Sequence, residues 1–170
     1  MSKKLKIYLA GPDVFEVKAL KKGEQLKELC NRFGYKGLFP LDNTLQLNNT
    51  PHQNARRIRQ ANIELIQKAD IIMANLNPFR GLEPDSGTVF EVGYAMALGK
   101  IVVGYAQDRR SMLKKVQKAQ HLPKHATLCN DGKIIEDFDL SHNLMFADIL
   151  VAKSPKKCLK WLNEHVSLED

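Results

Sequence analysis

The feature that most constrains the fold is a continuous apolar run at residues 70–76, DIIMANL. A strand that is apolar at nearly every position, rather than at every second one, is typical of a parallel sheet covered on both faces. A second run, IVVGY at 101–105, has the same character, and a helical segment lies between the two. This alternation of strands and helices predicts an α/β fold with helices on both faces of a parallel sheet.

Further elements extend the alternation along the chain. We expect strands at 6–10 and 36–39, and helices at about 17–33, from 53 onwards and at about 86–98. The polar segment 44–51 is expected to be a loop. Beyond residue 110 the patterns predict a basic helix within 111–125, a short strand near Ile134 and a closing helix at about 156–166. No repeat or linker divides the 170 residues, so residues 1–170 are interpreted as a single domain.

The charge balance raises the question of nucleic acid binding. Lys and Arg number 26 against 19 Asp and Glu, which gives a net charge of +7. Four lysines lie close together in the sequence, at positions 114, 115, 118 and 124. No aromatic residues accompany them to stack on bases, so a solvated face is favoured over a nucleic acid surface.

Other classes of protein are excluded by motifs that the sequence lacks. The three cysteines, Cys30, Cys129 and Cys158, form no CxxC pair and favour a reducing compartment. There is no HExxH, GxxxxGK[ST] or GxGxxG motif, so we expect neither a metal nor an organic cofactor. The apolar run before Gly11 is shorter than a signal peptide needs, and no stretch approaches about 18 apolar residues. We therefore expect a cytoplasmic protein without a membrane span.

Glu91 is the residue that fits its surroundings least well. It lies in SGTVFEVGYAMALG, a segment of apolar and small residues that is expected to form a fully covered helix. No cation stands three or four positions away, and a buried carboxylate without a partner is costly unless the site uses it. Gly87 leaves room one turn away for a ligand. The alternative is that this side of the helix faces solvent and that Glu91 is an ordinary surface residue.

Asp85 and Tyr8 are the candidates to act with Glu91. Asp85 begins the same helix, where it can cap the free backbone N–H groups or bring a second carboxyl to the site; the two roles are compatible. Tyr8 lies in the first strand and can direct its hydroxyl at Glu91 or simply belong to the core. Asp70 stands at the opposite end of its strand, so a turn or capping role is favoured for it.

On these residues the chain resembles the nucleoside 2-deoxyribosyltransferase family. The similar segments are KIYLAGPDVF, FPLDN, the long block ADIIMANLNPFRGLEPDSGTVFEVGYAMALGK and the short motif NLM at 143–145. The resemblance implies a flavodoxin-like fold with a five-stranded, doubly wound parallel sheet. It also implies a homo-oligomer, a hexamer or a dimer, whose subunits share their active sites.

The resemblance implies a role for each matching residue. Glu91 matches the nucleophile that attacks the anomeric carbon of a 2'-deoxynucleoside, Tyr8 matches the tyrosine that orients it, and Asp85 matches an aspartate that moves the proton of the leaving base. Asn143 matches a residue that a neighbouring subunit contributes to hold the sugar. The remaining substrate-binding candidates are Asp13, Phe15, Asp42, Asn62 and Gly87.

Two positions depart from the family pattern. Asn62 stands where some relatives carry an aspartate, although its amide can still bind the edge of a base. Thr44 follows PLDN at a position that varies in the family, so base preference does not carry over from it. The block PFRGLEPDSGT is more similar to the members that accept both purines and pyrimidines.

Three functions follow as hypotheses. The first is base exchange between 2'-deoxynucleosides and free nucleobases through a covalent intermediate on Glu91, within nucleoside salvage. The second is hydrolysis of a deoxynucleoside or its monophosphate by an N-glycosidase; the expectation that Asp13 repels a phosphate favours the nucleoside. The third is a catalytically silent nucleoside-binding module, which an unpaired Glu91 disfavours.

Overall fold

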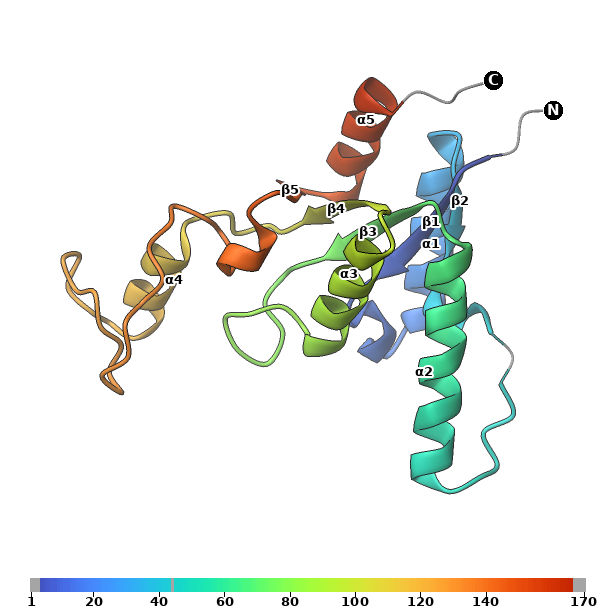
Figure 1. Ribbon diagram of the computed structural model, residues 1–170, viewed down its shortest axis with the longest axis horizontal. Helices are drawn as coiled ribbons and strands as arrows, with labels where there is room; N and C mark the ends of the chain where they lie inside the picture. Colours follow the sequence, from blue (N-terminus) through green and yellow to red (C-terminus); the bar gives the residue numbers. More distant parts are fainter. Residues whose placement is uncertain (1–3, 44, 167–170) are drawn as a thin grey trace.

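The strands form a parallel sheet at the centre of the molecule (Figure 1). A computed structural model describes residues 4–43 and 45–166. Within these residues there are five strands, in the order β2-β1-β3-β4-β5, and every neighbouring pair is parallel. Their bounds are β1 Lys6–Ala10, β2 Lys36–Leu38, β3 Ile71–Asn75, β4 Ile101–Tyr105 and β5 Leu150–Ala152. This order is that of the flavodoxin-like fold, as expected.

Helices cover both faces of the sheet. The longer helices are α1 Ala19–Arg32, α2 Pro51–Lys68, α3 Ser86–Ala97, α4 Met112–Ala119 and α5 Pro155–His165. Short 3₁₀ turns follow the first two strands and precede the last, at η1 Pro12–Phe15, η2 Pro40–Asp42 and η3 Leu144–Phe146. Helices α1 and α5 pack on one face, whereas α2 and α3 pack on the other. Helix α4 lies away from the sheet with its own small apolar cluster (Figure 1).

Strand β3 confirms the interpretation of its sequence as a buried strand, and β4 does so at its last three residues, since Ile101 is 38% exposed. Every residue of β3 is buried, and its neighbours β1 and β4 pair with it over four and five residues. Burial on both faces explains why these strands lack an alternating polar pattern. Asp70 lies at the amino end of β3, where its carboxylate accepts a hydrogen bond of 2.7 Å from the backbone N–H of Lys6. Asp70 therefore lies at the edge of the sheet opposite the site, as predicted, and its carboxylate joins β1 to β3 rather than capping a helix.

The strand predicted near Ile134 is wrong. Ile134 forms only an isolated antiparallel bridge with Leu128, and its side chain is 82% exposed. The fifth strand of the sheet is β5, which pairs with β4. With three residues, β5 is too short to give a periodic signal, and its register is set by β4 rather than by its own sequence.

The predicted solvated lysine face is also wrong at one position. Helix α4 ends at Ala119, and Lys115 on it is only 3% exposed. Lys115 shares a helix face with Met112 and Val116, one turn apart, and therefore turns inward with them. Its Nζ donates a hydrogen bond of 2.5 Å to the carbonyl of Ser141, and burial lowers its pKa.

Two helices expose more apolar side chains than predicted. The buried residues of α3 are confined to one side, at Thr88, Val92 and Ala95. Four apolar side chains of this helix and its end are between 37% and 49% exposed: Val89, Phe90, Met96 and Leu98. In α1, Leu20 is 67% exposed although its spacing suggested a core position. Apolar composition alone did not distinguish the covered side of these helices from the free one.

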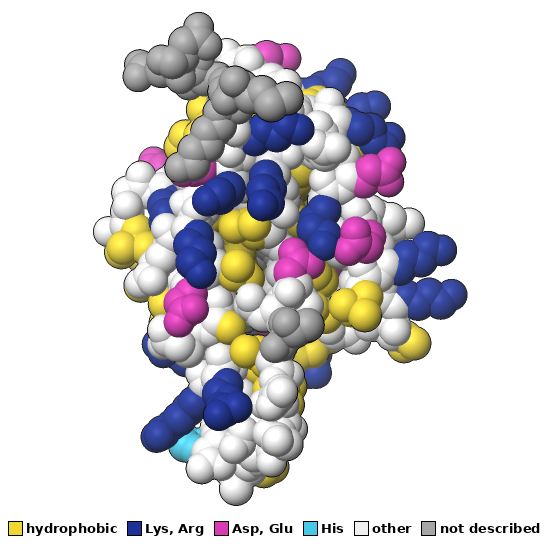
Figure 2. All heavy atoms as spheres, turned by 90° about the vertical axis from the view of Figure 1, so that its right-hand side faces the viewer, with side chains coloured by type: hydrophobic (Ala, Val, Ile, Leu, Met, Phe, Trp, Pro, Cys, Tyr) yellow, Lys and Arg dark blue, Asp and Glu magenta, His cyan; other side chains and the backbone are white. Residues whose placement is uncertain are grey.

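The surface does not gather its positive charge into one patch on the face that carries β2. Figure 2 shows Lys and Arg side chains spread over this face, with acidic side chains and apolar patches between them. In the chain outside residues 1–3, 44 and 167–170, no helix combines the length and the apolar character that crossing a membrane requires.

Two helical glycines give a matched test of the packing. A Cβ at Gly23 would lie 2.5 Å from the ring of Phe39, which is buried, whereas a Cβ at Gly93 would meet nothing within 4 Å. We expect Gly23→Ala to lower the free energy of unfolding by about 1–3 kcal/mol because the methyl group overpacks the α1–sheet contact. Gly93→Ala should raise it by up to about 1 kcal/mol, the helix-propensity gain. Urea unfolding measures both; equal effects would contradict the packing described.

Candidate active site

The centre of the site is a hydrogen bond between the first strand and the third helix. The hydroxyl of Tyr8 on β1 donates to Oε1 of Glu91 on α3, at 2.6 Å. The two residues are 83 positions apart in the sequence. They meet because β1 and β3 are neighbours in the sheet and α3 packs on the face toward which Tyr8 points. The other carboxylate oxygen, Oε2, accepts no hydrogen bond from the residues that the structure describes.

The surroundings of Glu91 favour its neutral form. The pKa of its carboxyl group is raised to about 7, because burial and the charge of Asp85 raise it by more than the hydrogen bond from Tyr8 lowers it. Burial and the Glu91 carboxylate both raise the pKa of Tyr8, so its hydroxyl stays protonated and remains a donor. The site therefore holds a carboxylate that is less stable than one in water, in contact with a fixed donor.

A cavity of about 490 Å³ lies between α2 and α3, with Glu91 in its wall. Helix α3 contributes Gly87 and, three and four positions further on, Phe90 and Glu91. Helix α2 contributes a matching stripe of five residues: Ala55, Ile58, Arg59, Asn62 and Ile63. Two facing helix stripes thus form a largely apolar cavity with few polar groups, the usual character of a small-molecule site.

Asn62 lines this cavity and carries an unpaired polar atom. Its Oδ1 is buried and has no hydrogen-bond partner among the described residues. Leaving a buried acceptor unpaired costs roughly 1–3 kcal/mol, so such atoms usually have a partner.

Asp85 caps the helix that carries Glu91. Its Oδ2 accepts hydrogen bonds from the backbone N–H and from the hydroxyl of Thr88, at 3.0 and 3.1 Å. A Cβ at Gly87 would lie 3.0 Å from the same oxygen, so glycine keeps the space beside the cap open. The cap uses one carboxylate oxygen and leaves Oδ1 without a partner in the described part of the chain. Asp85 is also close enough to raise the pKa of Glu91.

The loop after β1 holds one buried and one exposed candidate. Asp13 is only 4% exposed, and its carboxylate accepts a hydrogen bond from Nδ2 of Asn75 at 2.9 Å. It is not among the residues that line the cavity, so it has no direct contact there. Phe15 is 60% exposed and stacks on Phe79 with ring centroids 5.2 Å apart, while Arg80 lies over both rings.

Two other candidates lie apart from Glu91. The carboxylate of Asp42 accepts from the backbone N–H of Phe39 and pairs with Lys27 of α1 at 2.6 Å, so it faces the other side of the sheet edge. Asn143 caps η3: its Oδ1 accepts from the N–H of Met145, and its Nδ2 donates to Glu136. Neither residue lines the cavity of its own chain. The variable position Thr44 lies outside the described residues.

Sequence reasoning missed the α2 stripe and Phe90. Arg59 lies over the ring of Phe90, with its guanidinium carbon 5.5 Å from the ring centroid, at the rim of the cavity. Residues 55, 58, 59, 62 and 63 follow the i, i+3, i+4 pattern of one helix face. Once Asn62 is a candidate, this spacing identifies the residues beside it.

Titratable groups elsewhere do not form a metal site. In residues 4–43 and 45–166, no three His, Cys, Asp or Glu side chains come together as metal ligands would.

Comparison with known proteins decides the family. The model of the family described as nucleoside 2-deoxyribosyltransferase matches residues 7–145. The chain belongs to this family. The matched range contains every candidate residue described above, from Tyr8 to Asn143.

Several relatives are similar over much of the chain. A structure described as a 2-desoxiribosyltransferase from Leishmania mexicana is 33% identical, with a TM-score of 0.80 over 96% of this chain and 99% of that one. A 2-deoxyribosyltransferase from Bacillus psychrosaccharolyticus is 22% identical, with a TM-score of 0.58 over 91% of this chain and 90% of that one. A conserved protein from Enterococcus faecalis is 23% identical, with a TM-score of 0.65 over 96% and 100%. The last two comparisons support the fold alone.

A curated relative extends beyond the match. An uncharacterized protein from Schizosaccharomyces pombe is 32% identical over 114 residues, which are 65% of this chain. The match covers about half the length of that protein, 54%.

The raised pKa of Glu91 has a consequence for stability that can be measured. A carboxyl group with a pKa of about 7 in the fold and about 4.5 when exposed stabilises the fold below pH 4.5, and this contribution is lost as the pH rises through 7. Glu91→Gln removes the charge, so we expect it to raise the free energy of unfolding at pH 8 by up to about 3 kcal/mol. At pH 5 the gain should be much smaller.

Thermal unfolding at the two pH values tests this expectation. Glu164→Gln, on the exposed surface of α5, is the control and should change neither value. If the Glu91→Gln protein is less stable than the wild type at pH 8, the ionised Glu91 does not lower the free energy of unfolding, and the expectation is wrong.

Proposed function

We propose that the protein transfers the 2-deoxyribosyl group between nucleobases of 2'-deoxynucleosides, through a covalent intermediate on Glu91. The observation that carries the proposal is the half-buried Glu91 carboxylate, which is held by Tyr8 in the wall of a cavity large enough for a small molecule. Membership of the deoxyribosyltransferase family supports the reaction class. Base exchange of this kind would serve nucleoside salvage.

In the first step Glu91 acts as the nucleophile. With Oε1 fixed by the Tyr8 hydroxyl, Oε2 is free to attack the anomeric carbon of the sugar. A bond forms between this oxygen and the anomeric carbon, and the bond from that carbon to the base nitrogen breaks with its electron pair going to the base. Asp85 supplies a proton to the leaving nitrogen. Partial desolvation makes the carboxylate more reactive than it would be in water.

In the second step another nucleobase takes the sugar. Its ring nitrogen attacks the anomeric carbon, the ester bond to Glu91 breaks, and the electron pair returns to the carboxylate. The proton released by the incoming base goes back to Asp85, so the enzyme is restored. Two displacements at one carbon retain the configuration, as in retaining glycosidases. A substrate without a 2'-hydroxyl suits this chemistry because less electron density is withdrawn from the developing positive charge.

The nucleobase needs a flat apolar site with a few polar contacts. The cavity supplies Phe90 as an aromatic wall and the unpaired Oδ1 of Asn62 as an acceptor for a base N–H. The exposed ring of Phe15 offers a stacking surface at the carboxyl edge of the sheet. Because an asparagine presents both a donor and an acceptor, Asn62 suits both purines and pyrimidines.

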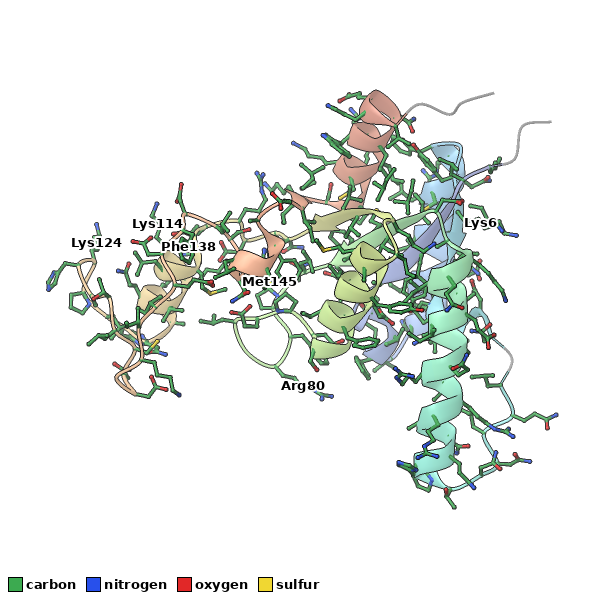
Figure 3. All side chains as sticks on the ribbon, in the orientation of Figure 1. Lys6, Arg80, Lys114, Lys124, Phe138 and Met145 are labelled. Carbon is green, nitrogen blue, oxygen red and sulfur yellow. The ribbon has the colours of Figure 1, made fainter. Side chains whose placement is uncertain are left out.

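We also propose that a second copy of the chain completes the site. Asn143 does not line the cavity of its own chain, and two large apolar side chains beside it are exposed: Leu144 by 46% and Met145 by 73%. Met145 projects from the segment beside α3 (Figure 3). Docking of this segment onto a neighbouring subunit would bury the apolar pair and bring Asn143 to that subunit's sugar.

The direct test is base exchange. The pure protein is incubated with 2'-deoxyinosine, with and without adenine, and the products are separated by chromatography. Transfer predicts 2'-deoxyadenosine only when adenine is present. Equal release of hypoxanthine in both samples would instead show hydrolysis, and no product at all would leave a nucleoside-binding module.

Variants assign the nucleophile. We expect Glu91→Ala to lower the rate of exchange by on the order of 10³-fold or more, because no other carboxylate lines the described part of the cavity. Asp131→Asn, in an exposed ion pair with Lys133, is the control and should keep the wild-type rate. Full activity of Glu91→Ala would refute the covalent mechanism.

The pH profile tests the role of Tyr8. Exchange requires ionised Glu91, so the acid limb of the pH–rate profile should follow the Glu91 pKa of about 7. Tyr8→Phe removes a hydrogen bond that favours the ionised form, so the pKa of Glu91 should rise further and the acid limb should move to higher pH. At pH 6 the variant should be about tenfold or more slower, with a smaller deficit at pH 9. An unmoved acid limb would contradict this role.

A further inference from the structure

Asp13 is a buried carboxylate that the proposed reaction does not use. Its side chain is 4% exposed, and it lies in η1 directly after β1. Burying a charge in this way is expensive unless partners compensate it. Since it does not line the cavity, its partners should show why it is there.

Those partners connect the carboxyl ends of three strands. Asp13 Oδ2 accepts from Nδ2 of Asn75, the last residue of β3, at 2.9 Å. Oδ1 of Asn75 in turn accepts from the backbone N–H and the Nδ2 of Asn77, at 3.1 and 2.7 Å. Oδ1 of Asn77 accepts from the N–H of Gln107, just beyond β4, at 2.9 Å. The chain of bonds fixes the loop after β1 against the loops after β3 and β4.

A lysine and a glycine complete the arrangement. Lys22 on α1 places its Nζ 3.6 Å from the other Asp13 oxygen. A Cβ at Gly11 would lie 2.6 Å from Oδ2 of Asp13 and 2.7 Å from Cβ of Asn75, so only glycine leaves room for the carboxylate at this point. The buried position of Asp13 is thus built into the loop rather than an accident of one side chain.

The same loop carries Phe15, and the loop after β3 carries its stacking partner. Phe15 lies two residues beyond Asp13, and its ring stacks on Phe79, with Arg80 4.7 Å from the Phe79 centroid and 5.6 Å from that of Phe15. Arg80 adopts a left-handed backbone conformation, with φ of 54°, and Figure 3 shows where it lies on this loop. The hydrogen bonds of Asp13 and the aromatic stack therefore connect the same two loops at two points.

We propose that Asp13 is a positioning residue that sets the place of Phe15 over the bound nucleobase. It acts through Asn75, which fixes the first loop relative to the loop that holds Phe79. This proposal rests on the proposed function, because it assumes that Phe15 contacts the base. An aromatic platform on an exposed loop binds well only when its position is fixed before the ligand arrives, and this network supplies that constraint.

A double-mutant cycle between Asp13 and Phe15 tests the proposal. Asp13→Ala leaves Nδ2 of Asn75 without its acceptor, and we expect the KM for 2'-deoxyinosine to rise about tenfold with a smaller change in kcat. In a Phe15→Ala background the same substitution should have almost no effect on KM, since there is no ring to misplace. Asp13→Asn keeps an oxygen that can accept from Asn75 and should restore part of the loss.

A control separates positioning from general destabilisation. Leu162 lies on α5 and is fully buried in the core, so Leu162→Val should lower the melting temperature without changing KM. Amide hydrogen exchange gives a readout independent of activity: Asp13→Ala should speed exchange at residues 12–16 and 75–77, whereas Leu162→Val should not. A KM that is unchanged in Asp13→Ala, or raised equally in both backgrounds, would overturn the proposal.

Failure of the proposed function would be visible separately. The dissociation constant of 2'-deoxyinosine, measured by calorimetry in a Glu91→Gln background, repeats the cycle without turnover. If the wild type binds the nucleoside but exchanges no base, the transferase proposal fails. The proposed role of Asp13 is then still tested by the coupling between Asp13 and Phe15 in the dissociation constants. If the protein does not bind the nucleoside, both are wrong.

Discussion

The site depends on the free energy needed to keep the Glu91 carboxylate out of water. A carboxylate on an apolar helix would normally be protonated or moved to the surface, and here its pKa is raised to about 7. The hydroxyl of Tyr8, on strand β1 below the helix, offsets part of this free energy by donating a hydrogen bond to Glu91. Only a fold that places the middle of β1 under α3 can supply such a donor, so the order of the central strands and the reactivity of the carboxylate are linked.

The helix α3 combines several requirements in twelve residues. One side packs on the sheet through Val92 and Ala95, its first turn is capped by Asp85, and its face toward α2 holds Glu91. The capping bonds fix the amino end of the helix, and the core contacts fix its distance from the sheet. The carboxylate therefore has little freedom, which is what a nucleophile needs for a defined attack geometry.

Much of the fold and the centre of the site could be predicted from the sequence. These features can be recognised in the sequence without knowledge of tertiary contacts. They are the apolar runs at β3 and β4 and the charge of Glu91 within an apolar segment. The predictions that failed depended on distant partners: the buried Lys115 donates to the carbonyl of Ser141, and Asp42 pairs with Lys27. The burial of Asp13 likewise requires Asn75, which is 62 positions away. Sequence spacing identifies a helix face, but it does not identify which distant polar group that face will meet.

The position of α2 has a consequence for how substrate range can change. Its buried residues, Ile63 and Ile66, lie in its second half, while the first half extends past the sheet (Figure 1). The stripe that faces Glu91 begins at Ala55 in that first half, outside the main core. Substitutions there can reshape the cavity at little expense to folding, whereas Glu91, the proposed nucleophile, stays anchored to the sheet. The residue proposed to react and the residues proposed to select the substrate thus lie in parts of the chain that can evolve at different rates.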